Sequence, residues 1–179
     1  MKRQDFSLQP FSPIGPPLTI EITGQIIRRP RQLAIRYDLR GDLSEVIIPA
    51  PAALPARRAG LWEETCCEFF LGVKDSPEYW EFNLSPAGHW NVYRFAGYRQ
   101  GMAEETALTS LPVSVRRGSD SLELGLELDV GGIVAADQPL MVGIAAVIKL
   151  TGGELTYWAL THPGPAADFH RRDSFVVEL

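Results

Sequence analysis

The residues best suited to chemistry lie in one stretch, Tyr79–Phe95, which reads YWEFNLSPAGHWNVYRF. Between its aromatic residues it carries Glu81 and Asn83, and then Asn91 and Tyr93, at every second position. Carboxylate, amide and hydroxyl groups bind the polar groups of a small ligand, while aromatic rings pack on its apolar surface. The spacing therefore predicts a ligand-binding face, although the solvent-facing side of an antiparallel sheet has the same pattern.

The turn in this stretch decides which residues share a face. Ser-Pro-Ala-Gly at residues 85–88 is typical of a three-residue hairpin loop in which Gly88 adopts the left-handed region. This loop pairs Ser85 with His89 and Glu81 with Tyr93. One face then holds the apolar residues Trp80, Phe82, Leu84, Trp90 and Val92, and the other holds Glu81, Asn83, Asn91 and Tyr93.

The preceding strand, expected at residues 64–73, divides in the same way. Cys67, Phe69 and Leu71 alternate with Cys66, Glu68 and Phe70, so the two sets point to opposite faces. If both strands belong to one sheet, Glu68 joins the polar face of the hairpin. We expect this face to be either a ligand-binding surface or a plain solvent surface.

The elements that must position these residues are short strands. Runs of β-branched and aromatic residues alternate with Gly, Pro and Asp along the chain. The pattern predicts an all-β fold of about ten strands with little helix, arranged as a two-sheet antiparallel β-sandwich of jelly-roll type. Residues 49–60 form a loop rich in proline and alanine, and residues 102–110 one helical turn or a loop. Strands are expected at residues 18–27, 32–39, 45–48, 64–73, 79–84, 90–95, 112–116, 121–130, 140–150, 154–161 and 174–179.

Length and charge limit the classes of function. The 179 residues suit one domain, which we place at residues 18–179 after an N-terminal arm at residues 1–17. A net charge of −5 offers no basic surface for nucleic acid or an anionic membrane. No apolar run reaches the roughly 18 residues of a membrane helix. The basic N-terminus lacks the apolar segment of a signal peptide. The only two cysteines are neighbours and offer no disulfide framework, which fits a reducing compartment, so we expect a cytoplasmic protein.

Several segments together resemble a known family. They are LWEETCCEFFLGV at residues 61–73, the stretch at residues 79–95, YRQGM at residues 98–102 and YWALTHPGPAADFHRRDSF at residues 157–175. These segments resemble the DOMON-like domains related to family 9 carbohydrate-binding modules. The resemblance implies a β-sandwich that binds a ligand without catalysis, the ligand being a sugar or haem. Sugar-binding relatives hold the ring between aromatic side chains and bind its hydroxyls with acidic and amide groups. The candidates at matching positions here are Trp62, Glu68, Glu81, Asn83 and Trp158.

Two other kinds of site remain open. The resemblance allows a haem with methionine and histidine axial ligands, for which the chain offers Met102, Met141, His89, His162 and His170. His162 and His170 also lie near Asp168 and Asp173, but their spacing matches no defined metal site. A sandwich commonly places recognition residues on such a loop, so we include His162 among the predicted ligand contacts.

No catalytic motif is present: the chain has no G-x-S-x-G, no H-E-x-x-H and no P-loop. We therefore expect no enzyme, although Glu68 and Glu81 could form a carboxylate pair of the glycosidase kind. We predict a non-catalytic domain that binds a glycan or another small polar ligand. The alternatives are a haem-binding domain of the same fold and a protein-interaction module without a small ligand. The predicted site comprises Trp62, Glu68, Glu81, Asn83, Asn91, Tyr93, Trp158 and His162.

Overall fold

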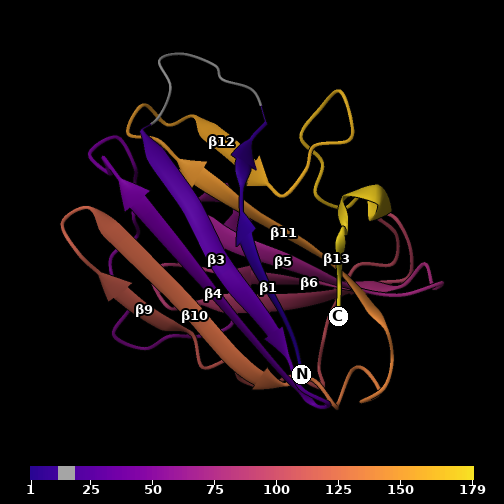
Figure 1. Ribbon diagram of the computed structural model, residues 1–179. Coiled ribbons are helices and arrows are strands. Elements are labelled where there is room, and N and C mark those ends of the chain that lie inside the picture. The colour runs from indigo at the N-terminus through magenta and orange to yellow at the C-terminus, as the bar shows by residue number, and fades with distance from the viewer. Residues whose placement is uncertain (12–18) are drawn as a thin grey trace.

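The computed structural model describes residues 1–11 and 19–179, and their strands form two antiparallel sheets packed face to face (Figure 1). The five-stranded sheet has the order β1-β3-β4-β10-β9. These strands are β1 (Lys2–Ser7), β3 (Ile20–Arg28), β4 (Gln32–Gly41), β10 (Ser121–Asp129) and β9 (Ser114–Arg117).

The eight-stranded sheet has the order β2-β12-β11-β5-β6-β7-β8, and β13 also pairs with β11. Two 3₁₀ turns, η1 (Leu61–Glu63) and η2 (Arg172–Ser174), are the only helical elements among the described residues. The strands are β2 (Gln9–Pro10), β12 (Leu155–Ala159), β11 (Leu140–Lys149), β5 (Cys66–Val73), β6 (Tyr79–Leu84), β7 (Trp90–Phe95), β8 (Ala103–Glu104) and β13 (Val177–Glu178). The prediction of an all-β, two-sheet sandwich with little helix is therefore confirmed.

The main core lies between the two sheets. Alternate residues of each long strand point into it, and Phe69 of β5 stacks on Phe82 of β6 with ring centroids 4.3 Å apart. Tyr37 of β4 joins the sheets, because its hydroxyl donates a hydrogen bond of 2.7 Å to the backbone carbonyl of Glu68. Burying each large apolar side chain contributes roughly 1.5–3 kcal/mol to stability. This core holds the eight-stranded sheet in place and fixes which residues lie on its outer face.

The β6–β7 hairpin has the predicted register. Glu81 lies opposite Tyr93 and Leu84 opposite Trp90. The backbone N–H of Ser85 donates to the carbonyl of His89 at 2.9 Å, and Gly88 has a φ of 88°. The apolar row packs in the core, so the polar row lies on the outer face of the sheet.

Short elements account for the differences from the predicted strands. The described residues form thirteen strands rather than about ten, because β1 and β2 lie in the expected arm, and β2 and β8 have only two residues each and carry no readable pattern. Residues 45–48 contribute only an isolated bridge between Val46 and Leu150, and residues 102–110 contain β8 rather than a helical turn. Only Val177–Glu178 of the closing segment form a strand, because η2 occupies its start.

Part of the predicted N-terminal arm belongs to the sheets. β1 pairs with β3, and β2 pairs with β12, so residues 2–10 bridge the two layers. The predicted boundary between residues 17 and 18 lies outside the described residues. None of the helical segments that the structure describes is long and apolar enough to cross a membrane.

Candidate functional site

Other side chains cover the outer face of the eight-stranded sheet, so its polar row is not exposed to solvent. Glu68 and Glu81 are 3% and 5% exposed, and Asn83 and Asn91 are fully buried. A second apolar cluster, which includes Phe70, Tyr79, Tyr93, Phe95 and Phe175, packs on this face. The interpretation of the polar row as a plain solvent surface is therefore wrong.

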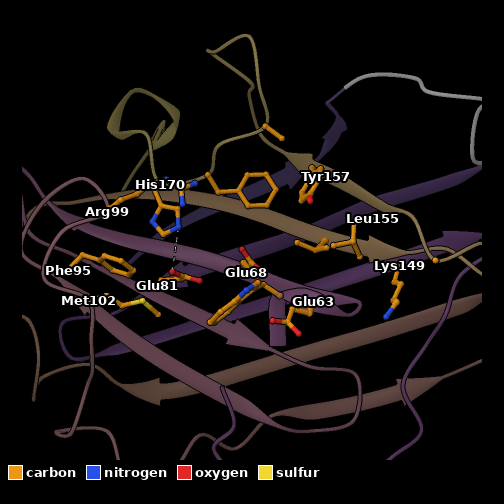
Figure 2. A pocket seen from close by; sticks show the side chains of 15 residues that line it. Glu63, Glu68, Glu81, Phe95, Arg99, Met102, Lys149, Leu155, Tyr157 and His170 are labelled. Atoms are coloured by element: carbon orange, nitrogen blue, oxygen red, sulfur yellow. Dashed lines mark ion pairs between the residues drawn. The ribbon is translucent and has the colours of Figure 1, made fainter. Parts of the chain in front are cut away.

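A cavity of about 540 Å³ opens on this face, and we call it the outer-face cavity (Figure 2). Glu68 from β5 and Glu81 from β6 form its floor and point into it. Aromatic side chains line its walls, and Arg99 and Lys149 lie at its edge. Its volume falls within the range of about 300–1,000 Å³ that is typical of small-molecule sites. The aromatic residues of the lining are Trp62, Phe95, Tyr157 and Phe169.

The two floor carboxyls are diagonal neighbours in the sheet. Glu68 pairs with Asn83, and Glu81 lies two residues before Asn83 on the same strand, so all three side chains share one face. Burial raises the pKa of both carboxyls, and the charge of Glu81 raises the pKa of Glu68 further. Asn83 counteracts this at Glu81, because its Nδ2 donates to Glu81 Oε1 at 2.9 Å.

The carboxyl of Glu68 lacks such support. Its Oε1 is fully enclosed and has no hydrogen-bond partner among the described residues. Glu68 is therefore the member of the pair that keeps a proton, and Glu81 is the member that ionises. The floor thus presents one proton donor and one acceptor to whatever enters the cavity.

A chain of hydrogen bonds orients His170 above Glu81. The backbone N–H of Arg99 donates to the Tyr79 hydroxyl at 3.2 Å, and this hydroxyl lies 2.9 Å from His170 Nδ1. Burial, and secondly the charge of Arg99, lowers the pKa of His170 to about 4, so the ring is neutral at pH 7. Nε2 lies 3.7 Å from Glu81 Oε2 (Figure 2). The neutral tautomer that suits both neighbours has the Tyr79 hydroxyl donating to Nδ1 and the ring proton on Nε2, beside the Glu81 carboxylate. This arrangement also favours an ionised Glu81.

The two cations at the cavity edge already have anionic partners. Arg99 Nη2 lies 2.8 Å from Asp168 Oδ1, and Lys149 Nζ lies 2.7 Å from Glu64 Oε1. Arg99 has a φ of 52°, in the left-handed region that non-glycine residues rarely adopt. The bond to Asp168 and the N–H bond to Tyr79 hold this strained residue in place.

The structure brings five of the eight predicted residues to the cavity or next to it. Trp62, Glu68 and Glu81 line it directly, and Asn83 supports Glu81 from the side. Tyr93 lies behind Trp62, with ring centroids 5.8 Å apart.

Asn91 belongs to a separate polar group that we call the Asn91 network. Its Oδ1 accepts a bond of 2.8 Å from Arg57 Nη1. Its Nδ2 lies within 3.1 Å of three acceptors, which are the Arg58 carbonyl, the Tyr93 hydroxyl and Glu104 Oε1. This network ties the 49–60 loop to the sheet, and Asn91 does not line the cavity.

Trp158 and His162 lie elsewhere. Trp158 is buried in the core between the sheets, where its Nε1 donates to Thr156 Oγ1 at 3.0 Å. Its neighbour Tyr157 points to the other face and lines the cavity, a choice that the alternating pattern left open. His162 Nε2 donates to the Gln9 carbonyl at 2.8 Å, and its ring packs on Phe11.

Sequence reasoning did not name Arg99, Lys149, Tyr157 or Phe169 as ligand contacts. It considered His170 as a metal or haem ligand and as part of the recognition loop, but from that loop it included only His162 in the site. Phe169 and His170 occur in the histidine-rich loop that the sequence marked for recognition, so that signal was available. Lys149 had no such signal, and Arg99 appeared only within the segment at residues 98–102 that carries the resemblance, with no role assigned to it.

The residues present do not fit an axially ligated haem. Of the five candidate ligands, only Met102 and His170 line the cavity. Both nitrogens of His170 already face a partner, namely Tyr79 and Glu81. His89 Nδ1 accepts the N–H of Ala56, and Met141 packs against the outer apolar cluster. Within residues 1–11 and 19–179, no three His, Cys, Asp or Glu side chains are placed to hold a metal ion.

Comparison with solved structures gives neighbours of the same fold. A Bacteroides uniformis protein described as a "putative carbohydrate-binding protein" superposes with a TM-score of 0.66 at 16% identity, covering 96% of this chain and 84% of that one. A family 9 carbohydrate-binding module from Caldicellulosiruptor kristjanssonii, solved with glucose, superposes with a TM-score of 0.51 at 8% identity, covering 91% and 77%. No protein-family model and no curated protein matches the chain.

Proposed function

We propose that this chain is a non-catalytic carbohydrate-binding domain whose ligand occupies the outer-face cavity. The observation that carries the proposal is the pair of buried carboxyls, Glu68 and Glu81, on the floor of a cavity with aromatic walls. Glu68 Oε1 itself is enclosed, so a ligand would bond to Glu68 through the part of the carboxyl that lines the cavity. A sugar hydroxyl suits this pair, because it can both donate and accept hydrogen bonds.

The rest of the lining suits a sugar ring. Trp62, Tyr157 and Phe169 offer aromatic surface on which the C–H groups of a ring can pack. A protonated Glu68 donates, and an ionised Glu81 accepts, so two neighbouring hydroxyls can be held in opposite senses. A purely apolar ligand would leave the Glu68 carboxyl without a partner among the described residues.

The structural neighbours support the same proposal. Both carry a carbohydrate-binding description, and the Caldicellulosiruptor kristjanssonii module was solved with glucose. The relationship to DOMON-like domains, inferred from the segments at residues 61–73, 79–95 and 157–175, is part of this proposal.

The test is calorimetry with a panel of neutral monosaccharides and oligosaccharides, using two matched variants. Trp62→Phe shortens an aromatic wall of the cavity, and Trp158→Phe makes the same change in the core. We expect at least one sugar to bind, Trp62→Phe to weaken that affinity by about tenfold, and Trp158→Phe to lower stability with affinity changed less than twofold.

Two results would count against the proposal: no binding across the panel, or equal losses of affinity in both tryptophan variants. The bound oligosaccharide should also be recovered intact after long incubation. Release of shorter products would show that the Glu68–Glu81 pair hydrolyses sugars, and the non-catalytic part of the proposal would be rejected.

A further inference from the structure

The floor of the outer-face cavity carries an excess of negative charge. The charge of Arg99 lowers the pKa of Glu81, but its guanidinium is shared with Asp168, and Lys149 is paired with Glu64. His170 is neutral at pH 7, since burial lowers its pKa to about 4. The titratable groups that face the cavity are Glu63 from η1, Glu68 from β5, Glu81 from β6, Arg99, Lys149 from β11, Tyr157 from β12 and His170.

The Glu68–Glu81 pair is the part of the floor where this negative charge is least favourable. Both side chains are at least nine-tenths buried, and they lie on adjacent strands of one sheet face. Two neighbouring buried carboxyls do not ionise together without a compensating positive charge, so the pair keeps a proton. A neutral hydroxyl supplies hydrogen bonds to this pair but no charge.

An ammonium group supplies both hydrogen bonds and a positive charge. It has three N–H donors, which match carboxylate oxygens, and its charge allows both carboxyls to ionise. The aromatic walls favour the same group, because the faces of Trp62, Tyr157 and Phe169 attract a nearby cation.

We propose that the outer-face cavity selects an amino sugar, with the ligand's ammonium group facing the carboxylates of Glu68 and Glu81. This inference rests on the proposed carbohydrate-binding function and specifies its ligand class. The protonated amine enters with its charge, Glu68 releases its proton to the solvent, and no covalent bond to the ligand forms or breaks. Binding is therefore coupled to the release of about one proton per ligand.

The experiment uses matched sets of three sugars on the whole chain: glucosamine, glucose and N-acetylglucosamine, and the corresponding galactose set. Calorimetry at pH 7 in two buffers of different ionisation enthalpy gives both the affinity and the number of protons released. We expect the free amine to bind about tenfold more tightly than the neutral sugar of the same set, with about one proton released.

Two variants of the pair and one control make the test specific. Glu68→Gln and Glu81→Gln each remove one carboxylate from the floor, and we expect both to abolish the preference for the amine and the proton release. Glu127→Gln makes the same change on β10 of the other sheet and should retain both. Circular dichroism confirms that each variant is folded before titration.

The possible outcomes separate this inference from the function on which it rests. If a neutral sugar binds as tightly as its amine and no proton is released, the amino-sugar inference is overturned while sugar binding stands. If the amine preference persists in both floor variants, the assignment to this pair is overturned. If every member of both sets fails to bind, the inference and the proposed function are overturned together.

Discussion

The outer face of the eight-stranded sheet holds two polar groups that differ in how well they are satisfied. In the Asn91 network, Asn91 bonds to Arg57, Arg58, Tyr93 and Glu104. In the Glu68–Glu81 pair, by contrast, Glu68 Oε1 is buried and lacks a partner among the described residues. A satisfied buried network stabilises a fold, whereas an unsatisfied group beside a cavity is suited to a ligand.

The chain contains only two asparagines, and they allow the sharpest test of this difference. Asn91→Ala removes the centre of the Asn91 network and leaves the Arg57 guanidinium without one acceptor. We expect the free energy of unfolding to fall by about 3 kcal/mol, with sugar affinity changed less than threefold. Chemical denaturation and calorimetry measure the two quantities.

Asn83→Ala is the matched control, because Asn83 is equally buried but bonds to Glu81. Its removal should cost less stability, about 1 kcal/mol, and should weaken sugar binding because Glu81 loses the donor that orients it. The reverse ranking, with Asn91→Ala the more damaging to binding, would place the Asn91 network in the site.

The proton on Glu68 is expected to have a smaller effect, on how the free energy of unfolding changes with pH. Because burial and Glu81 raise the pKa of Glu68, the native state keeps a proton that the unfolded chain loses above its ordinary carboxyl pKa. Stability therefore falls as the pH rises from about 4.5 towards the raised native pKa. Glu68→Gln removes this loss, so the variant should exceed the wild type at pH 8 by on the order of 1 kcal/mol, and the gap should close towards pH 4.

Denaturation curves across this pH range measure the effect, with Glu127→Gln as a control that follows the wild type. A constant difference between Glu68→Gln and the wild type at every pH would mean that Glu68 is ionised in the native state.

Much of the fold could be predicted because local chemistry determines it. Gly88 adopts the left-handed conformation that the Ser-Pro-Ala-Gly turn requires, and this turn sets the register of the whole β6–β7 hairpin. The register in turn separates Phe82, in the core, from Glu81, on the outer face. Two-residue strands such as β8 were not predictable, since neighbouring strands rather than their own sequence form them.

The site was only partly predictable for a related reason. Alternation placed Glu68 and Glu81 on one face, but it could not show that segments from elsewhere in the chain cover that face. Arg99, Tyr157 and His170 reach the cavity through tertiary packing alone. The same alternation could not decide between Tyr157 and Trp158, because adjacent residues of a strand always point to opposite faces.

The central claim, that sugar binds in the outer-face cavity, can be tested most directly through the tryptophan indoles. Trp62 lines the cavity, whereas Trp80, Trp90 and Trp158 are buried in the core. In an NMR titration with a sugar that calorimetry shows to bind, with indole signals assigned from single Trp→Phe variants, we expect the Trp62 N–H signal to shift most. An unmoved Trp62 signal at saturation, with the largest indole shift at a core tryptophan, would contradict the claim.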